Sequence, residues 1–482
     1  MLLAAVWLLI YPSIHRHSSF LQQHFRTYSY LFTARVAPAA ADSVQTQVSL
    51  PDSMVLDSVG LDSLLATPPP PAEVIPTDIP PLIGDYTGLD QLDSFFLELR
   101  QNKGQIRIAY YGDSSIEGDL MCMTFRDSMQ QRFGGNGVGF VPIMSEIPGF
   151  RRSVRHSFSN NWYRNVIGET NDRKMLRGIS GEYFVADQAP TLPDSMAVDS
   201  LLAEDSAPDE YWVQYRGSRW FAGTRTFNRS RLFYGRPQAD STGRAYGAVY
   251  SYANGQSGSH ALSAPELVNE VVLTDSVADR VRLQFDMYGT YPLYGVSLES
   301  KTGVIVDNFP CRGNSGRALL GISSSVMEHF QEKLDYDLII LQYGLNVINA
   351  RVQGYDWYER QLVNVIERFQ RTMPGVPILL IGVPDKGTKL NGQMQTDPSV
   401  PRVTNVQRRA AQQTGITFFS LYEAMGGPGS MVSWVEDERP RLANYDYTHF
   451  NFKGANVASD LLLEFLMAGY ADYRQNPEGL EL

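Results

Sequence analysis

Cysteine and histidine are scarce in this sequence, which limits the chemistry that it can support. It has two cysteines, Cys122 and Cys311, and seven histidines among 482 residues. Two thiols are too few for a disulfide-rich scaffold or for a multi-thiolate zinc or iron–sulfur site. Of the histidines, only His15 and His17 stand at a spacing that a metal site could use. We therefore expect no metal centre.

Positive charge is also in short supply. The formal net charge is −11, and no run of Lys or Arg occurs. An acidic chain lacks the broad positive field that attracts nucleic acids and anionic membranes, so no nucleic-acid partner is expected. Hydrophobic residues make up 43% of the chain, which is enough for a folded core. The length allows two or three domains.

The apolar run at the N-terminus covers residues 2–11 and is too short to span a bilayer, which takes about 20 residues. Its length suits the apolar centre of a signal peptide, although no Lys or Arg precedes it. The run is either the end of a longer signal or anchor, or a short apolar tail without a targeting role. We favour export, and predict residues 1–36 as a signal or anchor remnant that could attach the chain to a membrane.

Prolines and repeated Asp-Ser pairs dominate residues 37–87. This composition favours an extended spacer that cannot pack a core. A tether between an apolar N-terminus and a folded body predicts an exported enzyme, periplasmic or tethered to a membrane in a bacterial cell envelope.

Short apolar runs from residue 88 onward predict strands that alternate with helices. Helical spacing follows Ser114, recurs over Leu319–Leu334 and Tyr358–Phe369, and closes the chain at Phe452–Leu466. This alternation predicts an α/β fold, with a doubly wound parallel sheet and helices on both faces. The predicted strands are Ile106–Tyr111, Val304–Asn308, Asp337–Leu341, Ile378–Ile381 and Thr417–Phe419. Cys122 falls on an apolar helix face and is expected to be a buried free thiol, with a Cys122–Cys311 disulfide as the alternative.

The first two predicted strands are too far apart for one crossover, so a further domain is expected between them. Residues 210–300 are rich in aromatic residues, Val and Gly in short alternating runs, which predicts an antiparallel β-sandwich. We predict an α/β domain from 88–150 and 305–475, interrupted by the sandwich at 151–304 with an acidic disordered loop at 186–209. Aromatic side chains of the insert are expected in its core, with stacking on sugars as the alternative. These are Trp212, Trp220 and Tyr234.

Polar residues follow the predicted strands at the points where the strands end. In open α/β sheets, ligands bind at the carboxyl ends of the strands, so these segments are expected to converge on one crevice. The segments are Gly112-Asp113-Ser114, the loop with Gly313 and Gly316, Gly344 with Asn346, and Asp446 with His449.

Three of these residue types form a catalytic triad. A serine hydroxyl is a poor nucleophile until an imidazole takes its proton, so Ser114 needs a base such as His449. A carboxylate that fixes the imidazole tautomer is also needed, and Asp446 stands three residues before His449. As alternatives, GlyAspSer is a common turn, and Asp446 and His449 could cap the last helix.

An oxyanion hole would complete this site. The expected donors are the N–H of Ser114, the side-chain amide of Asn346 and the N–H of Gly316, with Gly313 as the alternative glycine. Each such donor is worth about 10²–10³ in rate.

The four blocks resemble those of SGNH/GDSL hydrolases, in which the named residues would be Ser114, Gly316, Asn346 and His449. The resemblance implies a flavodoxin-like doubly wound sheet. One position departs from the family pattern: the block GlyLeuAsn is followed by Val347, where the family often has Asp. The family's Asp is mainly supporting, so its loss affects loop hydrogen bonding more than catalysis.

Two further segments resemble the peptidoglycan O-acetylesterase branch of the family, which carries a carbohydrate-binding-like jelly roll inside the hydrolase domain. They are TyrGlyValSerLeu at 294–298 and MetGlyGlyProGlySerMet at 425–431. The resemblance implies a cofactor-free serine esterase that removes an acyl group, expected to be acetyl, from a cell-envelope polysaccharide such as peptidoglycan. Two alternatives stay open: a polysaccharide O-acetyltransferase with the same triad, and a glycan-binding envelope protein with an idle hydrolase domain.

Overall fold

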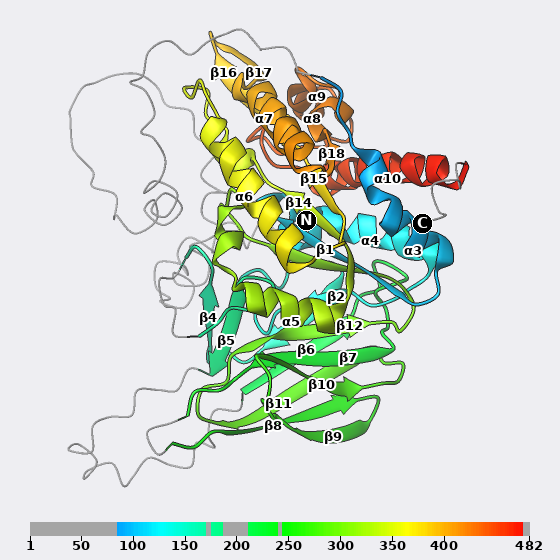
Figure 1. Cartoon of the computed structure of the whole chain (residues 1–482), viewed down its shortest axis with the longest axis vertical. Helices are drawn as coiled ribbons and strands as arrows, with labels where there is room; N and C mark the ends of the chain where they lie inside the picture. Colours follow the sequence, from blue (N-terminus) through cyan, green and yellow to red (C-terminus); the bar gives the residue numbers. More distant parts are fainter. Residues whose placement is uncertain (1–83, 170–174, 187–210, 240–242, 476–482) are drawn as a thin grey trace, which may run out of the picture. The chain divides into compact units, whose positions relative to one another are not determined.

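The computed structural model describes residues 84–169, 175–186, 211–239 and 243–475. The predictions for the apolar N-terminus, for the tether up to residue 83 and for the acidic loop from residue 187 lie outside these ranges. The described residues form an α/β domain and an antiparallel β-sandwich (Figure 1). Among them, no helix combines the length and the apolar character that a membrane span requires.

Five parallel strands form the central sheet of the α/β domain. The strand that comes first in the chain lies between the second and the third, which is the flavodoxin-like order. Nearly all residues of these strands are buried, because helices cover both faces of the sheet. The predicted fold class is confirmed. The order across the sheet is β13 (Gly303–Pro310), β1 (Gln105–Gly112), β14 (Tyr336–Gln342), β15 (Ile378–Ile381) and β18 (Thr417–Phe419).

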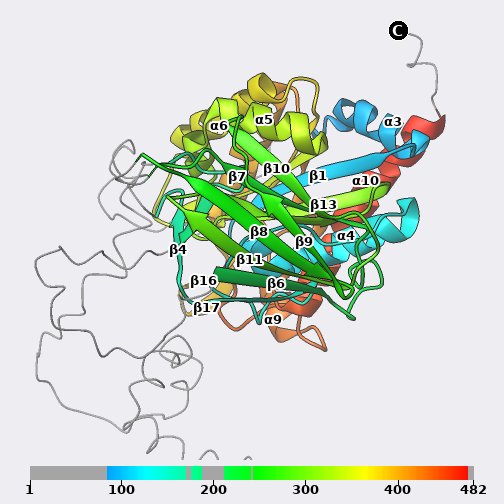
Figure 2. The same ribbon diagram turned by 90° about the horizontal axis from the view of Figure 1, so that it is seen from below.

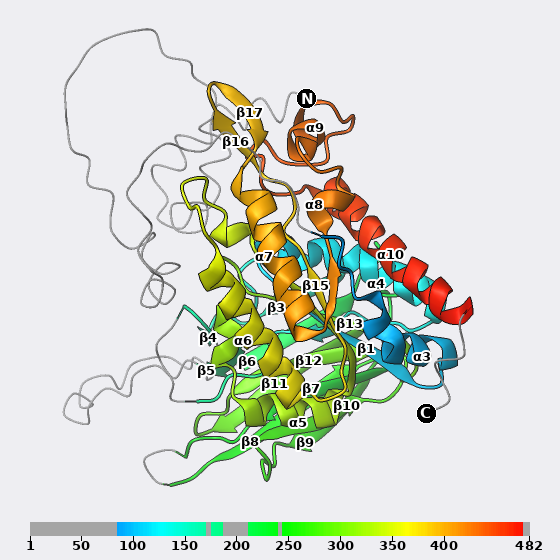
Figure 3. The same cartoon turned by 45° about the horizontal axis from the view of Figure 1, so that its top comes forward.

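The helices divide between the two faces of this sheet (Figure 3). One face is covered by α5 (Ser324–Leu334), α6 (Asp356–Thr372) and α7 (Ser399–Thr414), and the other by α3 (Asp93–Gln101), α4 (Leu120–Phe133) and α10 (Phe452–Gln475). Shorter elements connect them. These are η2 (Leu89–Leu92), η3 (Ser114–Asp119), η5 (Arg317–Gly321), η6 (Leu345–Val347), α8 (Leu421–Ala424), α9 (Ser430–Glu436) and the hairpin of β16 (Gly387–Leu390) and β17 (Gln393–Thr396).

Some helices differ from the sequence-based prediction. The helix expected over Leu319–Leu334 is interrupted, because Ser323 is extended and separates η5 from α5. Neither α3 nor α7 was predicted. In α7, the polar side chain of Gln407 is buried, where its amide accepts the N–H of Val383 at 2.8 Å and donates to the carbonyl of Tyr343 at 2.7 Å. A buried face that includes such polar residues hides the apolar periodicity.

The β-sandwich consists of two antiparallel sheets that enclose a separate apolar core. The sheet with β8 (Tyr246–Ala253), β9 (Gln256–Ala261) and β11 (Arg280–Tyr288) is in the foreground of Figure 2. The first sheet contains β10 (Val268–Thr274), β7 (Arg229–Gly235), β12 (Leu293–Glu299), β5 (Glu182–Ala186) and β4 (Trp162–Val166), and β2 (Gly139–Val141) also pairs with β12. The second contains β3 (Val154–Phe158), β6 (Tyr211–Gly217), β11 (Arg280–Tyr288), β8 (Tyr246–Ala253) and β9 (Gln256–Ala261).

The three aromatic side chains expected in the sandwich core have different environments. Tyr234 is in the core. Trp212 is half-buried, with the guanidinium carbon of Arg282 4.1 Å from its ring centroid. Trp220 is 68% exposed in the loop after β6, so the prediction is wrong for this residue.

Aromatic contacts join the sandwich to the α/β domain. The ring of Phe140 in β2 lies 5.6 Å from that of Phe309 in β13 and 6.3 Å from that of Phe330 in α5. Phe233 of β7 also packs on Phe330, at 5.6 Å. One outer face of the sandwich is therefore part of the core of the α/β domain.

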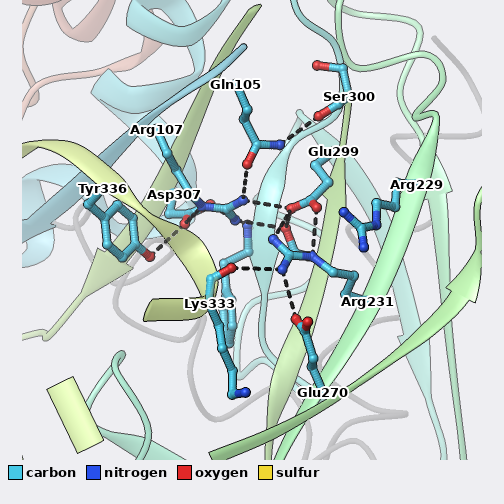
Figure 4. Close-up of polar contacts among 12 residues, drawn as sticks. Gln105, Arg107, Arg229, Arg231, Glu270, Glu299, Ser300, Asp307, Lys333 and Tyr336 are labelled. Atoms are coloured by element: carbon cyan, nitrogen blue, oxygen red, sulfur yellow. Dashed lines mark hydrogen bonds and ion pairs between the residues drawn. The ribbon is translucent and has the colours of Figure 1, made fainter. Parts of the chain in front are cut away.

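A buried charge network crosses the same boundary (Figure 4). Arg107 of β1 donates to Asp307 of β13 at 2.7 Å and to Glu299 of β12 at 2.6 Å. Arg231 of β7 donates to the same Glu299 carboxylate at 2.7 Å. The hydroxyl of Tyr336 donates to Asp307, also at 2.7 Å. The network thus connects three strands of the parallel sheet with two strands of the sandwich.

Electrostatic pairing keeps these groups charged although they are buried. Burial alone would raise the pKa of Glu299, but Arg107 and Arg231 lower that pKa to about 2. Burial would lower the pKa of Arg107, whereas Asp307 and Glu299 raise it above its usual value. Removal of one partner would leave a buried charge uncompensated, which typically costs about 3–5 kcal/mol.

We expect Arg107→Met to lower the free energy of unfolding by about 3–5 kcal/mol, because Glu299 and Asp307 would lose their shared cation. The matched control is Lys301→Ala, since the Lys301–Asp275 ion pair is 53% exposed on both sides and such pairs contribute about 0–1 kcal/mol. Guanidinium denaturation followed by circular dichroism measures both. Equal midpoints for the two variants would contradict the role given to Arg107.

Candidate active site

Three loops emerge side by side at the carboxyl edge of the parallel sheet. Gly112, the last residue of β1, is in register with Pro310 of β13 and with Gln342 of β14. Ser114 therefore begins η3 next to the loop that follows β13 and next to Asn346 in η6. The convergence expected from the sequence follows from this parallel register.

The side chains of Ser114, His449 and Asp446 form a continuous relay. Ser114 Oγ lies 3.2 Å from His449 Nε2. His449 Nδ1 lies 2.8 Å from Asp446 Oδ2. With the proton on Nδ1, this contact is a donated hydrogen bond, and Nε2 is left as the acceptor that faces the serine hydroxyl.

A tight turn fixes Asp446 in this position. Its Oδ1 accepts the backbone N–H groups of Thr448 and His449, each at 3.0 Å. Burial would raise the pKa of Asp446, but the hydrogen bonds from the His449 side chain and from these N–H groups hold the pKa below its usual value. Asp446 is therefore ionised at neutral pH and can stabilise an imidazolium at His449.

Asp113 organises the loop that carries the serine. This buried side chain accepts the N–H of Ser115 at 2.9 Å and its hydroxyl at 2.8 Å. Its second oxygen accepts the side-chain amide of Asn346 at 3.1 Å. Burial raises the pKa of Asp113, although the hydrogen bonds from Ser115 oppose this shift. The sequence motif GlyAspSer contains this residue, but its link to Asn346 could not be read from the motif.

Two of the expected oxyanion donors are already hydrogen-bonded. Besides Asp113, the Asn346 amide donates to the carbonyl of Asn314 at 2.9 Å. The N–H of Gly316 donates to the side-chain oxygen of Asn314 at 2.7 Å. Asn314, which sequence reasoning did not single out, thus accepts hydrogen bonds from both expected donors, the Asn346 amide and the Gly316 N–H. Among the residues that the structure describes, the N–H of Gly313, the alternative glycine, meets no acceptor.

The relay is open to solvent. The side chains of His449 and Asp446 are 45% and 49% exposed, and Ser114 is partly exposed. A cavity of about 100 Å³ lies beside η3, with Glu117, Arg151 and Phe309 in its lining, but none of the three relay residues lines it. A substrate at Ser114 would therefore be bound largely by the surrounding surface.

Neither thiol forms a disulfide, and the described ranges hold no metal-binding cluster. Cys122 and Cys311 are both free. Cys122 lies on the buried face of α4, as expected, and burial raises its pKa well above the usual value, which suppresses thiolate reactivity. Over the described residues, no three His, Cys, Asp or Glu side chains gather in a way that could hold a metal ion.

Residues 275–457 match the GDSL-like lipase/acylhydrolase family. The chain contains a GDSL-like lipase/acylhydrolase domain. The matched residues include Gly316, Asn346, Asp446 and His449 and also the sandwich strands β11 and β12, whereas Ser114 precedes the match. The resemblance to SGNH/GDSL hydrolases is thereby confirmed. No protein among the curated sequences matches the chain.

One solved structure shares the fold over most of the chain. The chain is similar to a peptidoglycan O-acetylesterase, with a TM-score of 0.60 and 20% identity over 81% of this chain and 99% of that one. An acetylxylan esterase from Geobacillus stearothermophilus gives a TM-score of 0.27 and 17% identity over 34% of this chain and 73% of that one. The first likeness extends over most of the chain, and at this identity it shows a common fold.

We expect Asp446→Asn to lower kcat for ester hydrolysis by about 10²–10⁴, because a neutral amide cannot stabilise an imidazolium and its NH2 group can face Nδ1, which favours the wrong tautomer of His449. The matched control is Asp437→Asn, which changes an exposed carboxylate near the same loop. Steady-state hydrolysis of p-nitrophenyl acetate measures both variants. Similar kcat values for wild type and Asp446→Asn would remove Asp446 from the relay.

Proposed function

We propose that this protein is a serine esterase that removes an acyl group, expected to be acetyl, from a cell-envelope polysaccharide such as peptidoglycan. The observation that carries the proposal is the relay of Asp446, His449 and Ser114, with contacts of 2.8 and 3.2 Å. A hydroxyl, an imidazole and an ionised carboxylate in this order form the arrangement that activates serine for acyl transfer.

In the first step, Ser114 Oγ attacks the ester carbonyl and its proton passes to His449 Nε2. The imidazolium is stabilised by Asp446 and then protonates the departing sugar hydroxyl. A water molecule, deprotonated by His449, attacks the acyl-Ser114 ester and releases the acid. Apart from water, these steps use only groups of the chain itself, and no cofactor takes part.

The tetrahedral anion needs hydrogen-bond donors beside Ser114. We assign this role to the backbone N–H groups of Ser114 and Gly313, neither of which meets an acceptor among the described residues. Asn346 becomes a third donor when the hydrogen bond from its amide to the Asn314 carbonyl is replaced by one to the anion. The hydrogen bond from the same amide to Asp113 is retained. Gly316 acts indirectly in this account, since its N–H orients the side chain of Asn314.

Two observations support a polymeric substrate. The relay is exposed at the surface, which gives access to an ester on a long chain but encloses little of a small ligand. The similar solved structure that extends over 81% of this chain is a peptidoglycan O-acetylesterase. Together with the apolar N-terminus, they favour an exported enzyme that acts in the periplasm or close to a membrane.

We expect Ser114→Ala to lower kcat for p-nitrophenyl acetate by more than about 10³, because the nucleophile is removed while the donors stay. Ser115→Ala is not a suitable control, since its hydroxyl binds Asp113, and the exposed Ser276→Ala is used instead. Circular dichroism should give the wild-type spectrum for both. Activity in folded Ser114→Ala above a tenth of the wild-type value would overturn the proposal.

Asn346→Ala tests the exchange of hydrogen bonds. We expect kcat to fall by about 10²–10³ with little change in KM, because the lost donor acts on the anion and not on the bound ester. Steady-state kinetics on p-nitrophenyl acetate separates the two constants. A loss of less than threefold would mean that Asn346 stays on the Asn314 carbonyl throughout the reaction.

A further inference from the structure

A group of aromatic side chains packs against the loop that carries Ser114 and at the start of the helix that follows His449, and it comes from both parts of the fold. Phe452 begins α10, three residues after His449. Phe150, from the loop between β2 and β3, lies against Gly118 in η3, four residues after Ser114. Gly118 has φ +61, and a Cβ there would come within 2.2 Å of the Phe150 ring, so only glycine fits this contact. The sandwich therefore reaches the serine loop directly.

Arg152 packs between the rings of Phe452 and Trp220, so that these side chains and Phe150 form a continuous surface. The rings of Phe150 and Phe452 lie 5.1 Å apart at 35°. The guanidinium carbon of Arg152 stands 3.4 Å from the Phe452 ring centroid and 4.8 Å from that of Trp220. The order across the surface is thus Phe150, Phe452, Arg152 and Trp220. We call these four residues the aromatic platform.

The platform is unlike the aromatic residues of the two cores. Trp220 is 68% exposed and Phe150 is 40% exposed, whereas residues such as Tyr215 and Phe233 are fully buried. Large exposed aromatic surface is unfavourable in water, and a contiguous patch usually marks a binding site. Here the patch adjoins residues that are expected to act on the substrate.

Arg152 provides a second reason to expect a ligand. Its guanidinium stacks on two rings, yet it forms no hydrogen bond and no ion pair with any residue that the structure describes. A planar guanidinium has five N–H donors, and stacking holds it in place without using them. The donors are therefore oriented and available.

We propose that the aromatic platform binds the glycan strand whose ester Ser114 cleaves, so that the sandwich takes part in substrate binding. Sugar rings have flat apolar C–H faces that stack on Phe150 and Trp220, and hydroxyl or carboxylate oxygens on their edges accept hydrogen bonds from Arg152. An acyl chain of a lipid has no groups that would use these donors. This inference rests on the proposed esterase function and adds the part of the surface that selects a polysaccharide.

The test compares a polymer with a small ester. For each variant, the initial rate of acetate release from O-acetylated peptidoglycan at limiting substrate is divided by kcat/KM for p-nitrophenyl acetate. We expect Trp220→Ala to lower this ratio about tenfold, since one aromatic stacking partner is lost. The matched control is Tyr246→Ala, an exposed aromatic on β8 that stacks on Tyr288 in the second sheet of the sandwich. Its ratio should equal that of the wild type.

Arg152→Lys separates stacking and donor geometry from charge. Lysine retains the positive charge but has no planar group, so we expect a lower ratio for this variant as well. A wild-type ratio in both Trp220→Ala and Arg152→Lys would overturn the platform, as would an equal loss on both substrates, which would indicate a distorted relay.

Failure of the platform can be told apart from failure of the esterase proposal. Ser114-dependent acetate release from peptidoglycan with a wild-type ratio in both Trp220→Ala and Arg152→Lys would overturn the platform alone. Ser114-dependent hydrolysis of p-nitrophenyl acetate without acetate release from peptidoglycan would overturn peptidoglycan as the substrate, for the proposed function and for the platform, and leave the esterase chemistry in place. Hydrolysis of p-nitrophenyl acetate that does not depend on Ser114 would overturn the proposed function itself.

Discussion

Arg107 lies where β1 of the parallel sheet meets β12 of the sandwich, and its guanidinium bridges Asp307 and Glu299, one from each side. All three side chains are buried, so each depends on the others for compensation of its charge. The geometry of these ion pairs is restricted, because the N–H donors of a planar guanidinium point in fixed directions and only a few arrangements of carboxylates can receive them. It therefore fixes how the inserted strands sit on the α/β domain.

The fixed position of the sandwich on the α/β domain matters because the inserted sandwich separates Ser114 from the other site residues along the chain. Ser114 precedes the sandwich strands, whereas Asn346 and His449 follow them. The parallel register of β1 with β13 and β14 brings these segments together again. The same packing of the sandwich on the α/β domain holds Phe150 against Gly118. The sandwich therefore contributes a side chain to the surface of the loop that carries the nucleophile.

The five strands and the candidate relay residues could be predicted from the sequence, because buried parallel strands are apolar runs and reactive groups follow their carboxyl ends. The order of the strands was implied only by the resemblance to SGNH/GDSL hydrolases. It could not predict α7, in which Gln407 is buried to satisfy Val383 and Tyr343. The choice between Gly313 and Gly316 depends on the side chain of Asn314, and the aromatic platform depends on contacts between distant segments. Neither the choice of the glycine donor nor the aromatic platform produces a periodic pattern in the sequence.

The central claim is that His449 activates Ser114 as a nucleophile. The most direct measurement is covalent labelling by a fluorophosphonate, followed by intact-mass and peptide mass spectrometry. We expect one adduct per chain, located on Ser114, absent in Ser114→Ala and formed at least about 10²-fold more slowly in His449→Ala. A folded wild-type protein without an adduct at Ser114, or with labelling that His449→Ala leaves unchanged, would contradict it.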